Sequence, residues 1–223
     1  MKGPVLFLAC SAVLGGTVHA LSLEAVLGRM ERAETEVRGL RFDFTQTTRL
    51  TLTGESVRSE GSASFERPNR FRVEQRSPQR QTIVSDGKDL WFYSPSRGQV
   101  MRDSMQNWAR SAGFPQGLTP FRMDVGEMRR KYAFALDSAD PKTPTLKLSP
   151  VDTAALPYTL RVWVDMATGL PKKTELSSSS VTAMTEVRNA RVNPAFTADT
   201  FSFRPPAGTD VIAPLDFSSK DHP

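Results

Sequence analysis

Apolar residues recur at helical spacing near the start of the chain and at alternate positions over most of the remainder. In the first region, the apolar positions between Ser22 and Gly39 fall on one face of a helix: Leu23, Val26, Leu27, Met30, Ala33 and Val37. Ser22 suits the N-cap of this helix and Gly39 suits its end. The spacing therefore predicts one amphipathic helix.

Alternating segments follow, separated by turn residues such as Asp86-Gly87. We expect strands within 41–52, 61–66, 70–75, 80–85, 89–94, 99–101, 132–137, 145–149, 158–165, 172–176, 181–187 and 201–203. Residues 89–94 lack clean alternation, which indicates that both faces of that strand are covered. Between the two groups of strands, residues 103–126 have helix and loop signals, with Asp103 as a helix cap and Gly113 as a stop.

Many short strands joined by tight turns are typical of an antiparallel sheet that curls. The strand faces carry large aromatic residues: Phe42, Phe44, Phe65, Phe71, Trp91, Phe92, Trp163, Phe201 and Phe203. One N-terminal helix is too small to cover the concave face of such a sheet. We therefore expect residues 103–126 to cover part of it. The fold class predicted is α+β and mainly β.

The first 20 residues have the pattern of a secretory signal peptide. Lys2 precedes an uncharged apolar run, and small residues end at Ala20. We expect export of a mature domain that comprises residues 21–213, followed by a flexible tail at 214–223. Because Cys10 lies within the signal, the mature chain has no cysteine and no disulfide.

Composition argues against several classes of function. His19 leaves with the signal and His222 lies in the tail, so the mature domain lacks a histidine for acid–base catalysis or for a metal site. We expect no enzyme activity, no cofactor and no metal. Without Lys2 the chain has 28 basic and 24 acidic residues, a net charge of +4. The charges are well mixed, which does not favour nucleic acid as a partner.

Arg67 occupies an unusual position at the end of a strand. Ala63, Phe65 and Arg67 fall on one face, and Pro68 then interrupts the strand. Taken alone, Arg67 is a strand-end arginine that reaches solvent. Phe71 and the other aromatic residues, taken alone, are core residues. Core and cavity wall have the same pattern in a sequence.

Several blocks of the sequence resemble the LolA family of periplasmic lipoprotein carriers. They are "FDFTQ", "GSASFERPNRFR", "SPQRQTIVSDGKDLWFYSP" and "FSFRPPAGTDVI", in order from about Phe42 to Ile212. The resemblance implies a curved antiparallel sheet that forms an incomplete barrel, covered by an N-terminal helix and a helical lid, with an apolar cavity for acyl chains. The region 108–156 matches loosely.

The resemblance also implies roles for single residues. Arg67 corresponds to the arginine that locks the lid by bonding its backbone carbonyls, and Phe71 to an aromatic residue at the cavity mouth where partners dock. We expect the cavity to be lined by Phe44, Phe65, Trp91, Phe92, Trp163 and Phe201. The implied partners are acylated lipoproteins, an inner-membrane ABC lipoprotein exporter (LolCDE-like) and an outer-membrane receptor (LolB-like), with the carrier as a monomer.

Two alternatives belong beside this interpretation. A LolA-like paralogue or envelope-stress sensor for another lipid pathway would have the same half-barrel, although sensors usually carry a further domain. A periplasmic lipid hydrolase would need a nucleophile with an activated base, and no histidine is suitably placed for that role.

Overall fold

A computed structural model describes residues 20–105, 121, 125–154 and 157–212. The signal peptide predicted for residues 1–20, apart from Ala20, and the tail predicted at 214–223 lie outside the described residues. The strands are β1 (Gly39–Leu50), β2 (Ser56–Glu66), β3 (Arg70–Ser77), β4 (Gln81–Asp86), β5 (Asp89–Ser94), β6 (Gln99–Ser104), β7 (Tyr132–Ser138), β8 (Thr145–Pro150), β9 (Tyr158–Asp165), β10 (Leu170–Ser178), β11 (Val181–Val192) and β12 (Asp210–Ile212).

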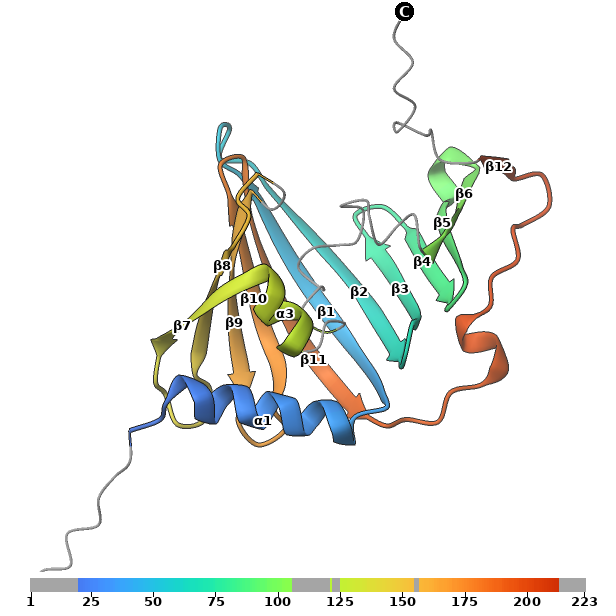
Figure 1. The fold of residues 1–223 in the computed structure, drawn as a ribbon. Helices are drawn as coiled ribbons and strands as arrows, with labels where there is room; N and C mark the ends of the chain where they lie inside the picture. The colour runs from blue at the N-terminus through green and yellow to red at the C-terminus, as the bar shows by residue number, and fades with distance from the viewer. Residues whose placement is uncertain (1–19, 106–120, 122–124, 155–156, 213–223) are drawn as a thin grey trace, which may run out of the picture.

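These strands form one sheet in the order β12-β6-β5-β4-β3-β2-β1-β11-β10-β9-β8-β7. Every neighbouring pair is antiparallel except β12 and β6, which run parallel. The sheet curls without closing, and β7 and β12 are its two edges (Figure 1). The predicted fold class is thereby confirmed, because the protein is mainly β and its sheet is an open half-barrel.

The helix α1 (Leu23–Glu36) runs across one end of the sheet (Figure 1). Ser22 caps it by accepting a hydrogen bond of 3.2 Å from the backbone N–H of Ala25, as its position in the sequence predicts. The apolar stripe buries Val26, Leu27, Met30 and Ala33 against the sheet. The helix ends three residues before Gly39, which is already the first residue of β1.

The concave side of the sheet holds two groups of buried side chains. The helix cluster packs beneath α1 and a second helix, α3 (Val125–Lys131), and contains Val26, Leu27, Met30, Val125, Met128, Tyr132, Leu146, Leu148, Leu160, Val162, Val164, Leu176 and Ala183. The aromatic cluster contains Leu40, Phe42, Phe44, Ala63, Phe65, Phe71, Val73, Ile83 and Leu90. The two clusters meet under the C-terminal half of α1, where the pocket described below lies.

The helical segment predicted at residues 103–126 differs in part from the structure. Asp103 is no helix cap, because it belongs to β6 and pairs with Leu90 of β5. Met105, directly after β6, is helical, and the rest of the helix predicted up to Gly113 lies outside the described residues. A further helix, α3, begins at Val125 within the predicted region and continues to Lys131, five residues past it. Most of the residues between β6 and α3 lie outside the described residues. The return to strand structure at Tyr132 is confirmed.

The chain after β11 crosses the convex face of the sheet before it ends in β12 (Figure 1). The short 3₁₀ helix η3 (Ala198–Phe201) lies in this crossing, while another, η1 (Pro95–Arg97), joins β5 to β6. Phe203 packs on Trp91 and Tyr93, with ring centroids 5.8 and 5.6 Å apart. Both faces of β5 are therefore covered, as its lack of clean alternation predicts.

Candidate functional site

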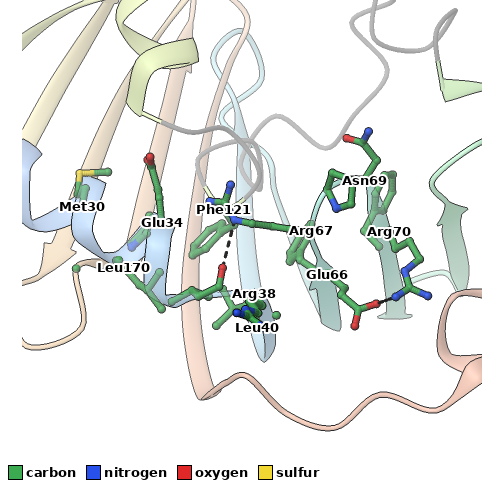
Figure 2. A pocket seen from close by; sticks show the side chains of 18 of the residues that line it. Met30, Glu34, Arg38, Leu40, Glu66, Arg67, Asn69, Arg70, Phe121 and Leu170 are labelled. Carbon is green, nitrogen blue, oxygen red and sulfur yellow. Dashed lines mark hydrogen bonds and ion pairs between the residues drawn. The ribbon is translucent and has the colours of Figure 1, made fainter.

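A pocket opens on the concave side between α1, the β2–β3 turn and the β9–β10 turn. Its walls are mainly apolar, and its cavity volume is about 70 Å³. The helices contribute Met30, Ala33, Glu34 and Met128. The β2–β3 region contributes Phe65, Glu66, Arg67, Pro68, Asn69, Arg70 and Phe71. The remaining lining residues are Val37, Arg38, Gly39, Leu40, Phe121, Gly169, Leu170 and Pro171. Figure 2 shows these side chains converging from separate parts of the fold.

Arg67 lies at the rim of this pocket, in the turn that follows β2. Its side-chain Nε donates a hydrogen bond of 3.2 Å to the carbonyl oxygen of Val37, the residue that caps the C-terminal end of α1 (Figure 2). Its backbone N–H donates to the carbonyl oxygen of Arg38 at 2.9 Å. The last carbonyls of a helix lack partners within the helix, so a guanidinium placed there is favourable. The arginine before Pro68 therefore ties the β2–β3 turn to α1.

Phe65, Phe71 and Phe121 bring aromatic rings to the wall of the pocket, and Phe42 packs behind them without lining it. The ring centroids of Phe42 and Phe65 lie 5.9 Å apart, and those of Phe65 and Phe71 lie 6.3 Å apart. The ring of Phe121 packs on that of Phe42, with the ring centroids 4.8 Å apart. Phe71 is only 1% exposed, so a partner protein could not touch its side chain in this conformation.

The six residues expected to line the cavity divide between the two faces of the sheet. Phe65 lines the pocket, and Phe44 is buried deeper in the same aromatic cluster. Phe92 packs against that cluster while remaining partly exposed. These three residues share the concave side with the pocket.

The other three, Trp91, Trp163 and Phe201, lie on the convex face and do not line the pocket. Trp91 is next to the inward-facing Leu90 and Phe92, so strand alternation turns it outward, where the guanidinium of Arg102 lies 4.9 Å from its ring centroid. Trp163 alternates with the inward-facing Val162 and Val164 in the same way. Phe201 is buried in η3 beneath the guanidinium of Arg70, at 5.4 Å.

The arginines around Arg67 are balanced by neighbouring acids. Arg70 pairs with Glu66, Arg72 pairs with Glu74 at 2.6 Å, and Arg76 pairs with Asp43 at 3.4 Å. The amide of Asn189 and then the guanidinium of Arg76 hold the pKa of Asp43 below its usual value, outweighing partial burial. These pairs favour a solvated, charge-balanced strand surface over a site for an acidic partner.

Tyr132 brings a hydroxyl group into the helix cluster. Its oxygen lies 3.0 Å from the hydroxyl oxygen of Tyr158. Burial, followed by the hydrogen bond to Tyr158, raises the pKa of Tyr132 well above its ordinary value. The phenol therefore stays neutral and cannot serve as a base near neutral pH.

The pocket is too small for a whole acyl chain. A water-sized group takes up about 30 Å³ in a condensed phase, so about 70 Å³ holds roughly two such groups. A sixteen-carbon chain has many times that number of groups. The walls that α1, α3 and Phe121 form must therefore separate before such a chain can enter.

Sequence reasoning missed the pocket residues that come from the helices and the β9–β10 turn. Glu34 is four residues after Met30 and three before Val37, which places it at the border of the apolar stripe of α1. This position at the border of the apolar stripe was the sequence signal that could have identified Glu34 as a pocket residue. Leu170, at the start of β10, has no such signal, because only the folded turn brings it to α1.

None of the helices in the described residues is both long and apolar enough to span a membrane. In the same part of the chain, no three His, Cys, Asp or Glu side chains gather in a way that could hold a metal ion.

Comparison with known proteins places these features in a family. Residues 35–204 match the model of "Outer membrane lipoprotein carrier protein LolA". An outer-membrane lipoprotein carrier protein of Methylibium petroleiphilum is 31% identical over 219 residues, which cover 96% of this chain and 100% of that protein. One from Albidiferax ferrireducens is 30% identical over 214 residues, covering 91% of this chain and 96% of that protein.

A solved structure of an uncharacterised conserved protein from Thermus thermophilus has the same fold. Its TM-score is 0.54 at 13% sequence identity, and the match covers 86% of this chain and 98% of that one. The family is one of carriers, which agrees with the prediction that the protein is not an enzyme. The open half-barrel, the pocket beneath α1 and the sequence match together show that this chain belongs to the LolA family of outer-membrane lipoprotein carrier proteins.

Proposed function

We propose that this protein is a periplasmic carrier that binds the acyl chains of lipoproteins released from the inner membrane and delivers them to an outer-membrane receptor. The observation that carries the proposal is the apolar pocket between α1 and the aromatic cluster, in a chain of the LolA family. The secretory pattern of residues 1–20 supports export, with cleavage near Ala20.

The pocket suits a hydrocarbon that must be held for a time and then released. An acyl chain of sixteen carbons gains on the order of 10 kcal/mol when it leaves water, at about 0.8 kcal/mol per buried methylene. A carrier that supplied all of this would hold its cargo too tightly to pass it on. A cost of opening, subtracted from the binding free energy, brings the affinity into a usable range.

Arg67 supplies part of that cost. Its bond to the Val37 carbonyl must break, or move with α1, when the pocket widens. Hydrogen bonds from charged donors contribute about 1.5–3 kcal/mol each. The carbonyl that it bonds lies at the end of α1, so the lock that we propose fastens the N-terminal helix to the β2–β3 turn.

The aromatic residues of the concave side have distinct roles in this proposal. Phe65 meets the cargo first, because it lines the pocket, while Phe44 and Phe92 form the deeper wall that is reached once the pocket widens. Phe71 becomes a docking residue for partner proteins only when the opening exposes it. The partners are an inner-membrane ABC exporter, which loads the carrier, and an outer-membrane receptor of higher affinity, which unloads it.

Incubation with a radiolabelled triacylated lipoprotein tests the proposal. The lipoprotein is expected to elute with the protein as a soluble complex on gel filtration and to move, chemically unchanged, to vesicles that contain the receptor. Release of free fatty acid would indicate a hydrolase. Failure to form the soluble complex would contradict the carrier function.

A further inference from the structure

The helix α1 is fastened to the sheet at several points along its length. Arg29 donates hydrogen bonds to the carbonyl oxygens of Met166 and Ala167, at 3.2 and 2.7 Å, in the β9–β10 turn. At the C-terminal end of α1, the side chain of Asn193 donates a hydrogen bond to the carbonyl oxygen of Glu36 at 2.9 Å and accepts one from the backbone N–H of Arg38 at 2.8 Å. Movement of α1 away from the sheet would break all of these bonds together.

The helix α3 packs Val125 and Met128 against the apolar face of α1, and a small set of polar contacts adds to this packing within the described residues. Arg129 reaches Glu24 at 3.0 Å and Glu31 at 3.8 Å, but all three side chains are largely exposed. Exposed ion pairs of this kind contribute little. A further polar contact lies at the pocket itself, where the Oε1 atom of Glu34 accepts a hydrogen bond of 2.5 Å from the backbone N–H of Val125.

The hydrogen bond between the Glu34 carboxylate and the Val125 N–H is stronger than the exposed ion pairs of Arg129. Val125 begins α3, so its N–H has no partner within the helix. A carboxylate at that end interacts favourably with the helix dipole, and its charge shortens and strengthens the hydrogen bond. Glu34 is only partly exposed, and it lines the pocket together with Met128 of α3. The bond therefore fixes the start of α3 over the cavity.

We propose that Glu34 is a positioning residue that holds α3 closed over the pocket and sets the cost of opening it. The inference rests on the proposed carrier function. It adds a second contact that holds the pocket closed, the hydrogen bond between Glu34 and Val125, which we call the latch, to the lock formed by Arg67. Arg67 fastens α1 to the sheet side of the pocket, whereas Glu34 fastens the second helix to α1. When the bond to Val125 breaks, α3 swings outward about its junction with β7, while α1 keeps the bonds that involve Arg29 and Asn193.

Two variants of Glu34 separate the charge from the hydrogen bond. Glu34→Ala removes both, and Glu34→Gln keeps an acceptor without the charge. Glu36→Gln is the matched control, because it removes a charge from the same helix at a side chain that is 64% exposed and faces Arg29. Circular dichroism and thermal unfolding check that each variant folds.

Two measurements are made on each variant. The first is the dissociation constant for a fluorescent hexadecanoic acid. The second is the distance between spin labels at Arg32→Cys of α1 and Arg130→Cys of α3, both exposed, in a Cys10→Ser background that leaves no other cysteine. The distance is measured without lipid, so it reports the latch even if the probe does not bind.

Glu34→Ala is expected to bind the probe about tenfold more tightly, because the closed state no longer competes as strongly. Its label distances should show a longer component that is absent from the unsubstituted protein and from Glu36→Gln. Glu34→Gln should lie between the two. If the Glu34 variants matched Glu36→Gln in both measurements, the role proposed for Glu34 would be wrong. If Glu34→Ala does not fold, Glu34→Gln decides alone, and an unchanged affinity and distance would overturn the proposal. If the unsubstituted protein bound no probe, the carrier function would fail, while the label distances would still decide the latch.

Discussion

The Nε atom of Arg67 donates a hydrogen bond of 3.2 Å to the carbonyl oxygen of Val37, and so joins the β2–β3 turn to the residue that ends α1. The two residues are 30 positions apart in the sequence, yet both line the same pocket. The bond lies where an entering acyl chain would have to part the turn from the helix.

Arg67→Leu is expected to fold and take up cargo but to release it about tenfold more slowly, since the closed state loses a bond from a charged donor. The fold should survive because the backbone bond from Arg67 to Arg38 does not need the side chain. Transfer of labelled lipoprotein to acceptor vesicles measures the effect. Arg67→Lys, which keeps the charge without the planar fork, should be intermediate. A Leu variant that delivers at the normal rate would show that Arg67 is no lock.

Leu170→Asp should weaken binding of a fluorescent fatty acid by tenfold or more, because an apolar chain in the pocket would strip water from the new carboxylate. Leu170 lines the pocket and is partly exposed, so the substitution should not unfold the protein. Thr168→Asp adds the same charge at an exposed position in the same turn and is the control. Equal affinity in the two variants would place the acyl chain elsewhere.

Gly169→Ala should destabilise the protein by several kcal/mol. The residue has a φ of +74°, and an added Cβ would lie 2.5 Å from the carbonyl oxygen of Arg29, where α1 meets the turn. Gly98→Ala is the control, because its φ is +61° but nothing lies within 4 Å of the added atom. We expect that control to lose only about 1–2 kcal/mol, the cost of the left-handed backbone. Urea unfolding of both variants measures the difference, and equal losses would exclude a tight contact with α1.

Asp43 predicts a dependence of stability on pH. Its pKa is lowered in the folded protein, mainly by the Asn189 amide, so the stabilisation is complete above the ordinary value of 3.8 and is lost as the pH falls through the lower folded value. Because this carboxylate is largely exposed, the loss should be under about 1 kcal/mol. Asp43→Asn should therefore be less stable than the unsubstituted protein at neutral pH, with the gap closing below the ordinary pKa. A gap that stays constant during acid titration would contradict this assignment.

Local patterns predicted most elements of the fold well, but the strand expected at 201–203 is wrong, because Phe201 belongs to η3 and the last strand is β12. The stripe of α1, with Ser22 at its start, and the alternation of the strands are set by neighbouring residues, and the open antiparallel sheet follows from them. The helix α3 was missed because its seven residues, beginning at Val125, are too few to show a helical period.

The site was harder to predict, because it depends on which face of a strand meets the cavity. Trp91 and Phe92 are adjacent in β5, so strand alternation puts only one of them on the concave side. Trp91 is nevertheless partly buried, since Phe203 covers it from the convex side. No local pattern foretells that the chain after β11 returns across that face. The partner of Arg67 was equally hidden, because the end of α1 meets the β2–β3 turn only in the folded protein.

Native mass spectrometry of the protein purified from the periplasm of its own cells shows whether it carries an acyl chain. We expect a fraction of molecules with the added mass of an acylated lipoprotein or lipid, and we expect Leu170→Asp to abolish this fraction while Thr168→Asp retains it. Protein that has no acyl adduct, and that takes up none when mixed with triacylated lipoprotein, would show that the pocket does not carry acyl chains.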